Sequence, residues 1–228
     1  MTEDRVLKPR GTLATHARIA LAINVVVAIA EPIVWLMMAL SRGTAALTAM
    51  GLYSLKFFTV LSNLLLGLAS LIYAVYLVRY VRSGRIVPKW AHLLKYAGTV
   101  AVTVTLMTVL LFLGPTMGYA AMFAGVNLWL HLVLPVLGIA EFVFLDTQRG
   151  ISFKESLVGV LPVLVYGAFY YGNILINGVG TRPYTNDWYG FTMFGVQYMP
   201  VVLVVMLLAT WVFALAVRAG NGAVRARR

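Results

Sequence analysis

Six long apolar segments, separated by short stretches rich in glycine, proline and charge, make up most of this chain. Each is at least about 20 residues long, the length that an α-helix needs to cross the hydrocarbon core of a bilayer. The pattern predicts an all-α integral membrane protein, a bundle of six transmembrane helices in one domain over residues 1–228. Pro162 and Pro200 indicate kinks in the last two spans. The predicted spans are Ala17–Leu40, Leu52–Val78, Leu93–Leu113, Ala120–Leu145, Leu157–Ile176 and Phe194–Val217.

The positions of the basic residues test this count. When six spans are counted, all of the 18 lysines and arginines fall on one side of the membrane except Arg42, Lys56 and Arg182. The positive-inside rule then places both termini in the cytoplasm. The same rule explains the net charge of +11 without a nucleic-acid partner, because the basic residues flank the apolar runs.

Composition narrows the chemistry that such a protein can use. Hydrophobic residues make up 61% of the chain, charged residues 11%, and the mean hydropathy is +0.89. The absence of cysteine excludes disulfides, thiolate metal sites and a cysteine nucleophile. A single histidine within the spans, with no second ligand at metal spacing, leads us to expect no haem, no other cofactor and no metal. The Ala-, Val- and Arg-rich composition suggests the plasma membrane of a bacterium.

His131 is the only histidine inside the apolar segments, and it is the first candidate for a functional group. An imidazole is costly to keep in a membrane, so by default it marks a site that faces the bundle interior. From the rise of an α-helix, Thr59 lies about 9 Å below Tyr53 in span 2, and His131 lies in the outer half of span 4. Both spans run from outside to inside, so the two residues lie at similar depth.

Further polar residues gather in the same outer half of the membrane. Glu31, for example, lies about 13 Å below the outer end of span 1. These side chains are candidates for binding a substrate or for stabilising an oxyanion. The candidates are Glu31, Lys56, Asn63, Asn127, Asn173 and Arg182.

Each candidate also has a structural interpretation. Thr59 can bond the carbonyl of Leu55 within its own helix. Asn63 and Asn127 can join neighbouring helices through their amides. Glu31 can form a structural pair with a histidine or a lysine.

Charged residues near the ends of the spans are expected to reach water. Lys56 is expected to extend to the outer interface. Glu141 and Asp146, near the inner end of span 4, are expected to reach cytoplasmic water. His16 and His92 are expected at the cytoplasmic edge.

The longest outer connection, residues 177–193, is rich in aromatic side chains such as Trp188, Tyr189 and Phe191. Such residues suit a belt at the membrane interface. The alternative is that this loop covers a site in the outer half of the bundle, with Arg182 available to an anionic head group.

Thr59 and His131 together have the residue types of a covalent hydrolase. Without cysteine, such an enzyme needs a hydroxyl nucleophile, and a hydroxyl is weak until a base, usually histidine, removes its proton. If spans 2 and 4 pack together, the two side chains can come within hydrogen-bond reach.

Three short motifs, in the second span, the fourth span and the last outer loop, point the same way. They are Lys56-Phe57-Phe58-Thr59, Asn127-x-x-x-His131 followed by Leu134-Pro135 and Glu141, and Arg182-Pro183-Tyr184 with Trp188 and Phe191 downstream. With the six-span pattern, they resemble the androgen-induced/FAR-17a-like family of membrane proteins, and in particular a bacterial branch of it.

That resemblance implies a membrane threonine hydrolase that cleaves fatty acid esters of hydroxy fatty acids. It implies acylation of Thr59 and then hydrolysis by water that His131 activates, with a membrane lipid or fatty acid ester as substrate. Two other functions remain open. One is a small-molecule or proton-coupled carrier in which Glu31 and His131 form a titrating pair. The other is a non-enzymatic lipid-binding scaffold.

Overall fold

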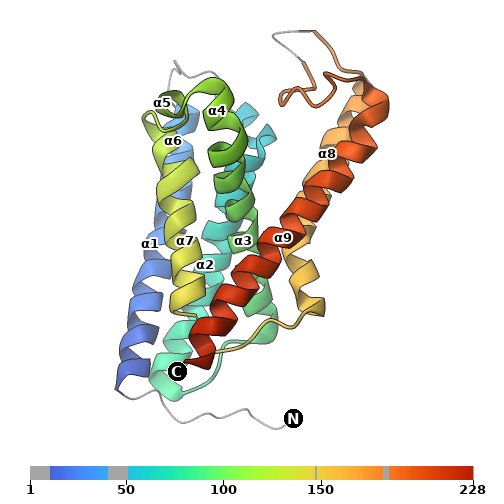
Figure 1. Ribbon diagram of the computed structural model, residues 1–228. Helices are drawn as coiled ribbons and strands as arrows, with labels where there is room; N and C mark the ends of the chain where they lie inside the picture. The colour runs from blue at the N-terminus through green and yellow to red at the C-terminus, as the bar shows by residue number, and fades with distance from the viewer. Residues whose placement is uncertain (1–10, 41–50, 147, 182–184, 228) are drawn as a thin grey trace.

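The protein is all-helical in the computed structural model, which describes residues 11–40, 51–146, 148–181 and 185–227 (Figure 1). Six helical spans are long and apolar enough to cross a membrane, and they match the six predicted segments in number and order. They are Thr12–Leu40, Phe58–Ser83, Lys89–Met117, Val126–Phe144, Lys154–Asn177 and Val196–Ala226.

Several spans are built from more than one helical element. The first two are single helices, α1 (Thr12–Leu40) and α2 (Phe58–Ser83), with the short η1 (Gly51–Lys56) before α2. The third consists of α3 (Lys89–Thr108), η2 (Val109–Leu113) and α4 (Gly114–Met117), and α5 (Tyr119–Met122) follows it. The remaining spans are α6 (Val126–Leu128), η3 (Trp129–Val133) and α7 (Leu134–Phe144); η4 (Lys154–Val160) and α8 (Leu161–Asn177); and η5 (Val196–Tyr198) and α9 (Met199–Ala226).

Helices α1, α2, α3 and α7 pack into one bundle, and α8 and α9 form a hairpin beside it (Figure 1). The hairpin meets the bundle at one end, where α9 contacts α3 and α7, and diverges from it toward the other end. Small residues bring the bundle helices close, as they do in many membrane proteins. A Cβ on Gly98 of α3 would lie 3.1 Å from the Cα of Leu66, and one on Gly138 of α7 would lie 2.6 Å from the Leu66 side chain.

Two π-helical turns, η2 and η3, interrupt the third and fourth spans. In η2 the N–H of Gly114 bonds the carbonyl of Val109, and in η3 the N–H of Leu134 bonds the carbonyl of Trp129. Each turn ends two residues before a proline, Pro115 or Pro135. A proline ring clashes with the carbonyl four residues earlier, and a wider turn relieves that clash. His131 lies in the second of these turns.

Pro162 and Pro200, where kinks were expected, lie where the helical geometry of their spans changes. Each lies in the first turn of an α-helix, α8 or α9, directly after a 3₁₀ turn. A proline is tolerated there because the first turn of a helix has no carbonyl for its missing N–H.

The two ends of the bundle differ in chemistry. The first residue of α1 and the last residue of α9 lie at the same end (Figure 1). We call this the basic end, after Arg79, Arg82, Lys89, Arg218 and Arg225. We call the opposite end the aromatic end, after Trp188, Tyr189 and Phe191, which lie in the connection between α8 and α9.

Candidate active site and a buried polar network

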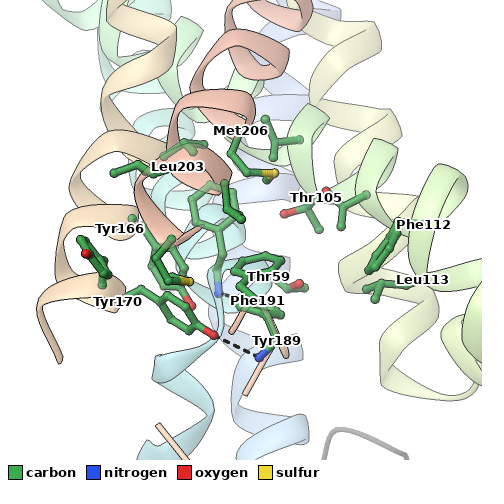
Figure 2. A pocket seen from close by; sticks show the side chains of 18 of the residues that line it. Thr59, Thr105, Phe112, Leu113, Tyr166, Tyr170, Tyr189, Phe191, Leu203 and Met206 are labelled. Atoms are coloured by element: carbon green, nitrogen blue, oxygen red, sulfur yellow. Dashed lines mark hydrogen bonds between the residues drawn. The ribbon is translucent and has the colours of Figure 1, made fainter. Parts of the chain in front are cut away.

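A cavity of about 100 Å³ lies toward the aromatic end, between α2, α3, α8 and α9 (Figure 2). Its walls are mostly apolar and aromatic, with a few hydroxyl groups. The residues that line it include Phe58, Thr59, Thr105, Tyr166, Tyr189 and Phe191. The predicted nucleophile therefore borders a hollow, whereas His131 is not among the residues that line it.

The hydroxyl of Thr59 makes no hydrogen bond within the described part of the chain. The expected bond to the carbonyl of Leu55 is not formed. The reason is local: α2 begins at Phe58, so Thr59 lies in the first turn and Leu55 belongs to the separate turn η1. A threonine in the first turn has no helical carbonyl four residues before it.

His131 is buried, with 5% of its surface exposed, and its ring orientation is determined by one hydrogen bond. Its Nδ1 lies 2.8 Å from the carbonyl oxygen of Met122, the last residue of α5. A carbonyl can only accept, so Nδ1 carries the hydrogen and Nε2 of a neutral ring has the free lone pair. Nε2 has no hydrogen-bond partner among the residues that the structure describes.

Asn63 connects the helices of the two predicted catalytic residues. Its side-chain amide donates to the carbonyl of Thr59 at 2.6 Å and to the carbonyl of Leu130, next to His131, at 3.0 Å. Spans 2 and 4 thus pack together. The side chains of Thr59 and His131 share no hydrogen bond in this structure.

The same contacts correct the expectation that Asn63 stabilises an oxyanion. A side-chain amide has two hydrogens, and both are used for the carbonyls of Thr59 and Leu130. Only its Oδ1, an acceptor, is without a partner. Asn63 is therefore a helix-to-helix bridge with no hydrogen left for an oxyanion.

The other two asparagines occupy different surroundings. Asn127, at the start of the fourth span and one turn before His131, is half-buried, and its amide makes no hydrogen bond within the described ranges. Asn173 accepts a hydrogen bond of 2.8 Å from Asn177 in α8 and does not line the cavity.

Lys56 lies against the aromatic loop, two residues before Phe58 of the cavity wall. Its ammonium nitrogen is 5.4 Å from the ring centre of Trp188 and 5.3 Å from that of Phe57. No described carboxylate pairs with it. Arg182, the other candidate for an anionic head group, lies outside the described residues with Pro183 and Tyr184.

The loop between α8 and α9 forms a cover over the cavity. The hydroxyl of Tyr189 accepts the backbone N–H of Phe58, the first residue of α2, at 2.8 Å. The indole N–H of Trp188 donates to the hydroxyl of Tyr166 at 3.0 Å, and that hydroxyl donates to the carbonyl of Lys56 at 2.6 Å. The aromatic side chains of this loop thus pack onto α2 and α8, as the alternative of a covering loop predicts.

Asp187 organises this loop. Its carboxylate accepts hydrogen bonds from the hydroxyls of Tyr170 and Thr192 and from the N–H groups of Phe191 and Thr192. Burial acts to raise the pKa of Asp187, but these hydrogen bonds outweigh it, so the pKa lies below its usual value of 3.8.

Glu31 is fully buried in α1 and does not line the cavity. Neither of its carboxylate oxygens has a hydrogen bond, and no described cation forms an ion pair with it. Its stem lies against Gly67 of α2, whose missing Cβ would be 2.8 Å from the Cβ of Glu31. The expected pairing with His131 is not formed.

A second polar cluster, which sequence reasoning missed, fills the bundle toward the basic end. The ammonium of Lys95 lies 3.1 Å from Glu141 and donates to the hydroxyl of Ser70 at 2.7 Å. The other oxygen of Glu141 accepts the amide of Asn24 at 2.8 Å. These four side chains come from α3, α7, α2 and α1, and none is exposed by more than 1%.

A second pair, between a histidine and a carboxylate, lies next to the first, closer to the basic end. Nδ1 of His92 is 3.0 Å from Asp146, and the hydroxyl of Tyr73 donates to the same carboxylate. The amide of Asn221 in α9 donates to the backbone carbonyl of Asp146. We call these two pairs and their polar partners the buried polar network. Glu141 and Asp146 therefore do not reach water as expected, and His92 borders a pocket at the basic end; each of the three is buried, with 1% exposed.

Two charged residues within the predicted spans indicate this network in the sequence. Lys95 and Glu141 lie inside two predicted spans and carry opposite charges, and a charge within a span needs a partner. No group of three or more possible metal ligands occurs in the described residues.

The comparisons with known proteins assign no family. No family model matches the chain, and no curated protein and no solved structure is similar to it.

Proposed function

We propose that this protein is an intramembrane hydrolase of lipid esters, with Thr59 as nucleophile and His131 as base. The observation that carries the proposal is the bridge of Asn63 between the carbonyls of Thr59 and Leu130. The bridge joins the helical turn that carries the hydroxyl of Thr59 to the turn that carries the imidazole of His131. The resemblance of the sequence motifs to a family of threonine hydrolases supports the same assignment.

The orientation of His131 supports its role as a base. A catalytic histidine needs an acceptor on one ring nitrogen so that the other presents its lone pair. The carbonyl of Met122 provides that acceptor, and Nε2 is left without a partner in the described residues. The unbonded hydroxyl of Thr59 is likewise free to turn toward a base or a substrate.

The reaction would proceed in two halves. Oγ1 of Thr59 attacks the ester carbonyl while its proton passes to Nε2 of His131, and the alcohol then leaves with that proton. A water molecule next gives a proton to His131 and attacks the acyl-threonine; the fatty acid leaves as that proton passes from His131 to Oγ1 of Thr59, which restores both residues. This sequence requires the two side chains to move into contact. Asn127, whose amide has no bond in the described part, is our candidate donor to the oxyanion.

The cavity fits a lipid substrate. Its walls are apolar, and it lies between helices that diverge toward the aromatic end, so an acyl chain can enter from the membrane. Lys56, close in sequence to Phe58 and Thr59 of the cavity wall, offers a positive charge to a carboxylate head group, with Arg182 as a second candidate. A fatty acid ester that carries a free carboxylate meets both requirements.

The positive-inside rule supports one orientation of the molecule. The basic end would face the cytoplasm, with both termini there, and the Thr59 cavity would face the outer leaflet. We propose the bacterial plasma membrane as its location.

The proposal is tested with a fluorophosphonate label that reacts with activated hydroxyl nucleophiles. Purified wild type in detergent is compared with Thr59→Ala and His131→Ala, and Thr105→Ala serves as the matched control because it removes another hydroxyl from the same cavity. Thermal unfolding in the same detergent shows which variants are folded. We expect wild type and Thr105→Ala to be labelled and the other two not. Equal labelling of Thr59→Ala, or none of folded wild type, would overturn the hydrolase.

A further inference from the structure

The buried polar network leaves one acidic side chain without a partner. Lys95 is the only described cation close enough to act electrostatically on Glu31, but its ammonium already pairs with Glu141 and bonds Ser70. Within the bundle, the positive charge of Lys95 is thus balanced by Glu141. A negative charge on Glu31 would have neither a counter-ion nor a hydrogen-bond donor.

An isolated buried charge of this kind is costly. Moving an ionised carboxylate out of water costs several kcal/mol even after the protein relaxes, and a carboxyl group avoids that cost by binding a proton. The residue of α2 that lies next to Glu31 is Gly67, which has no side chain and so offers no polar group. The surroundings therefore suit the neutral acid and not the carboxylate.

We propose that Glu31 is a proton-binding site, occupied in the resting protein and loaded from the basic end through the buried polar network. This inference concerns a second site and does not depend on hydrolysis at Thr59. It also differs from a titrating Glu31–His131 pair, because the proton reaches Glu31 from the basic end and not through His131.

The route begins at a polar pocket of about 320 Å³ at the basic end. His92 lines this pocket, and its Nε2 is buried without a hydrogen-bond partner. The other titratable or charged groups that face the pocket from the elements around it are Lys89, Arg149, Glu155 and Arg225. A buried imidazole that lines a polar pocket and has one ring nitrogen on a carboxylate is suited to pass a proton inward.

From His92 the network continues toward Glu31 along one face of α2. Tyr73 and Ser70 lie three residues apart on this helix, and Gly67 is three residues further, against Glu31. The titratable groups on the facing helices are His92 and Lys95 of α3 and Glu141 of α7, with Asp146 just beyond α7. Along α1, Asn24 reaches the same network two turns from Glu31.

The transfer is balanced as the movement of one proton. Cytoplasmic water gives a proton to Nε2 of His92, and the proton on Nδ1 passes to Asp146. It then moves by way of Glu141 to a carboxylate oxygen of Glu31, with the hydroxyls of Tyr73 and Ser70 and bound water as carriers. Asp146 and Glu141 return to their starting states, His92 is left as its other neutral tautomer with the hydrogen on Nε2, and the net change is one proton moved from the pocket to Glu31. If Glu31 lost that proton, its carboxylate would have to compete with Glu141 for the ammonium of Lys95.

The proposal is tested by infrared spectroscopy of the full-length protein in lipid nanodiscs at neutral pH. A protonated carboxyl group has a carbonyl-stretch band that a carboxylate lacks. We expect this band in wild type, its loss in Glu31→Gln and its displacement in Glu31→Asp. Glu155→Gln, which removes the carboxylate paired with Lys89 at the basic end, is the control and should keep the band.

Two further results decide the outcome. Absence of the band in wild type, or its loss in Glu141→Gln instead of Glu31→Gln, would overturn the site. For the route, transfer into deuterated buffer should shift the wild-type band quickly, and His92→Phe should slow that shift. An unchanged rate in folded His92→Phe would overturn loading through His92.

Discussion

The ammonium nitrogen of Lys95 lies 3.1 Å from a carboxylate oxygen of Glu141, and neither side chain is exposed by more than 1%. A buried ion pair of this kind does little for stability compared with apolar side chains of the same size, but it is costly to break. Its members hold α3 and α7 in register and determine which other groups in the bundle can be charged.

We predict that Lys95→Met destabilises the protein strongly, because Glu141 would be left as an unpaired buried charge. The expected loss is about 3–5 kcal/mol in the free energy of unfolding, measured by denaturant titration in detergent. The double variant Lys95→Met/Glu141→Gln should recover part of that loss. Lys154→Met, at an exposed position, is the control and should change little. A Lys95→Met protein as stable as wild type would show that the pair is not formed.

The close packing of α1 against α2 at Glu31 leads us to a second prediction, for a substitution of Gly67. A methyl group on Gly67 would lie 2.8 Å from the Cβ of Glu31, so Gly67→Ala forces the two helices apart. Overpacking of this size costs about 1–3 kcal/mol, which a shift in thermal unfolding would report. Gly172→Ala in α8, where a Cβ would meet nothing within 4 Å, should be neutral or slightly stabilising. Equal behaviour of the two variants would contradict the packing.

The bridge of Asn63 predicts a combined loss of stability and activity. Asn63→Leu keeps the volume but removes the amide that donates to the carbonyls of Thr59 and Leu130, which costs about 1–3 kcal/mol; the carbonyl of Thr59 keeps its bond from the hydroxyl of Ser62. Because the bridge ties Thr59 to the turn of His131, ester hydrolysis should fall further than stability does. Asn173→Leu is the matched control, since the amide of Asn173 bonds only Asn177. Normal turnover in a folded Asn63→Leu protein would remove the main support for the hydrolase.

The hydrogen bonds of Asp187 predict how the covering loop responds to acid. The pKa of Asp187 is lower in the folded loop than its usual value of 3.8, so the carboxylate adds stability that is fully present above that value. This stability is lost as the pH falls through the lower, folded pKa. Fluorescence of Trp188, obtained as the difference between wild type and Trp188→Phe, should be constant from neutral pH down to 3.8 and change below it. A change centred above pH 3.8 would show that the loop does not protect this carboxylate.

Hydropathy and basic-residue placement were enough to predict the six spans and their order. The depth of a residue follows from its place in a span, so the similar depth of Thr59 and His131 was also open to prediction. The bridge of Asn63 between the turns of Thr59 and Leu130 agrees with that depth.

The direction in which each side chain points around its helix axis could not be predicted from the sequence in the same way. Asn63 was expected to donate to a reaction intermediate, but both of its amide hydrogens face backbone carbonyls. Glu141 and Asp146 were expected in water because they lie near a span end. Their actual burial depends on Lys95 and His92 of another helix, and a one-dimensional pattern does not show which helices are neighbours.

The central claim is that Thr59 is the nucleophile, and the most direct measurement is to locate the adduct that a fluorophosphonate leaves on the wild-type protein. Digestion and mass spectrometry of the labelled protein should find the phosphonate on the peptide that contains Thr59, and fragmentation should place it on that residue. The neighbouring hydroxyls of Ser54 and Ser62 should be unmodified. An adduct on either serine, or on a residue outside the cavity, would contradict the account.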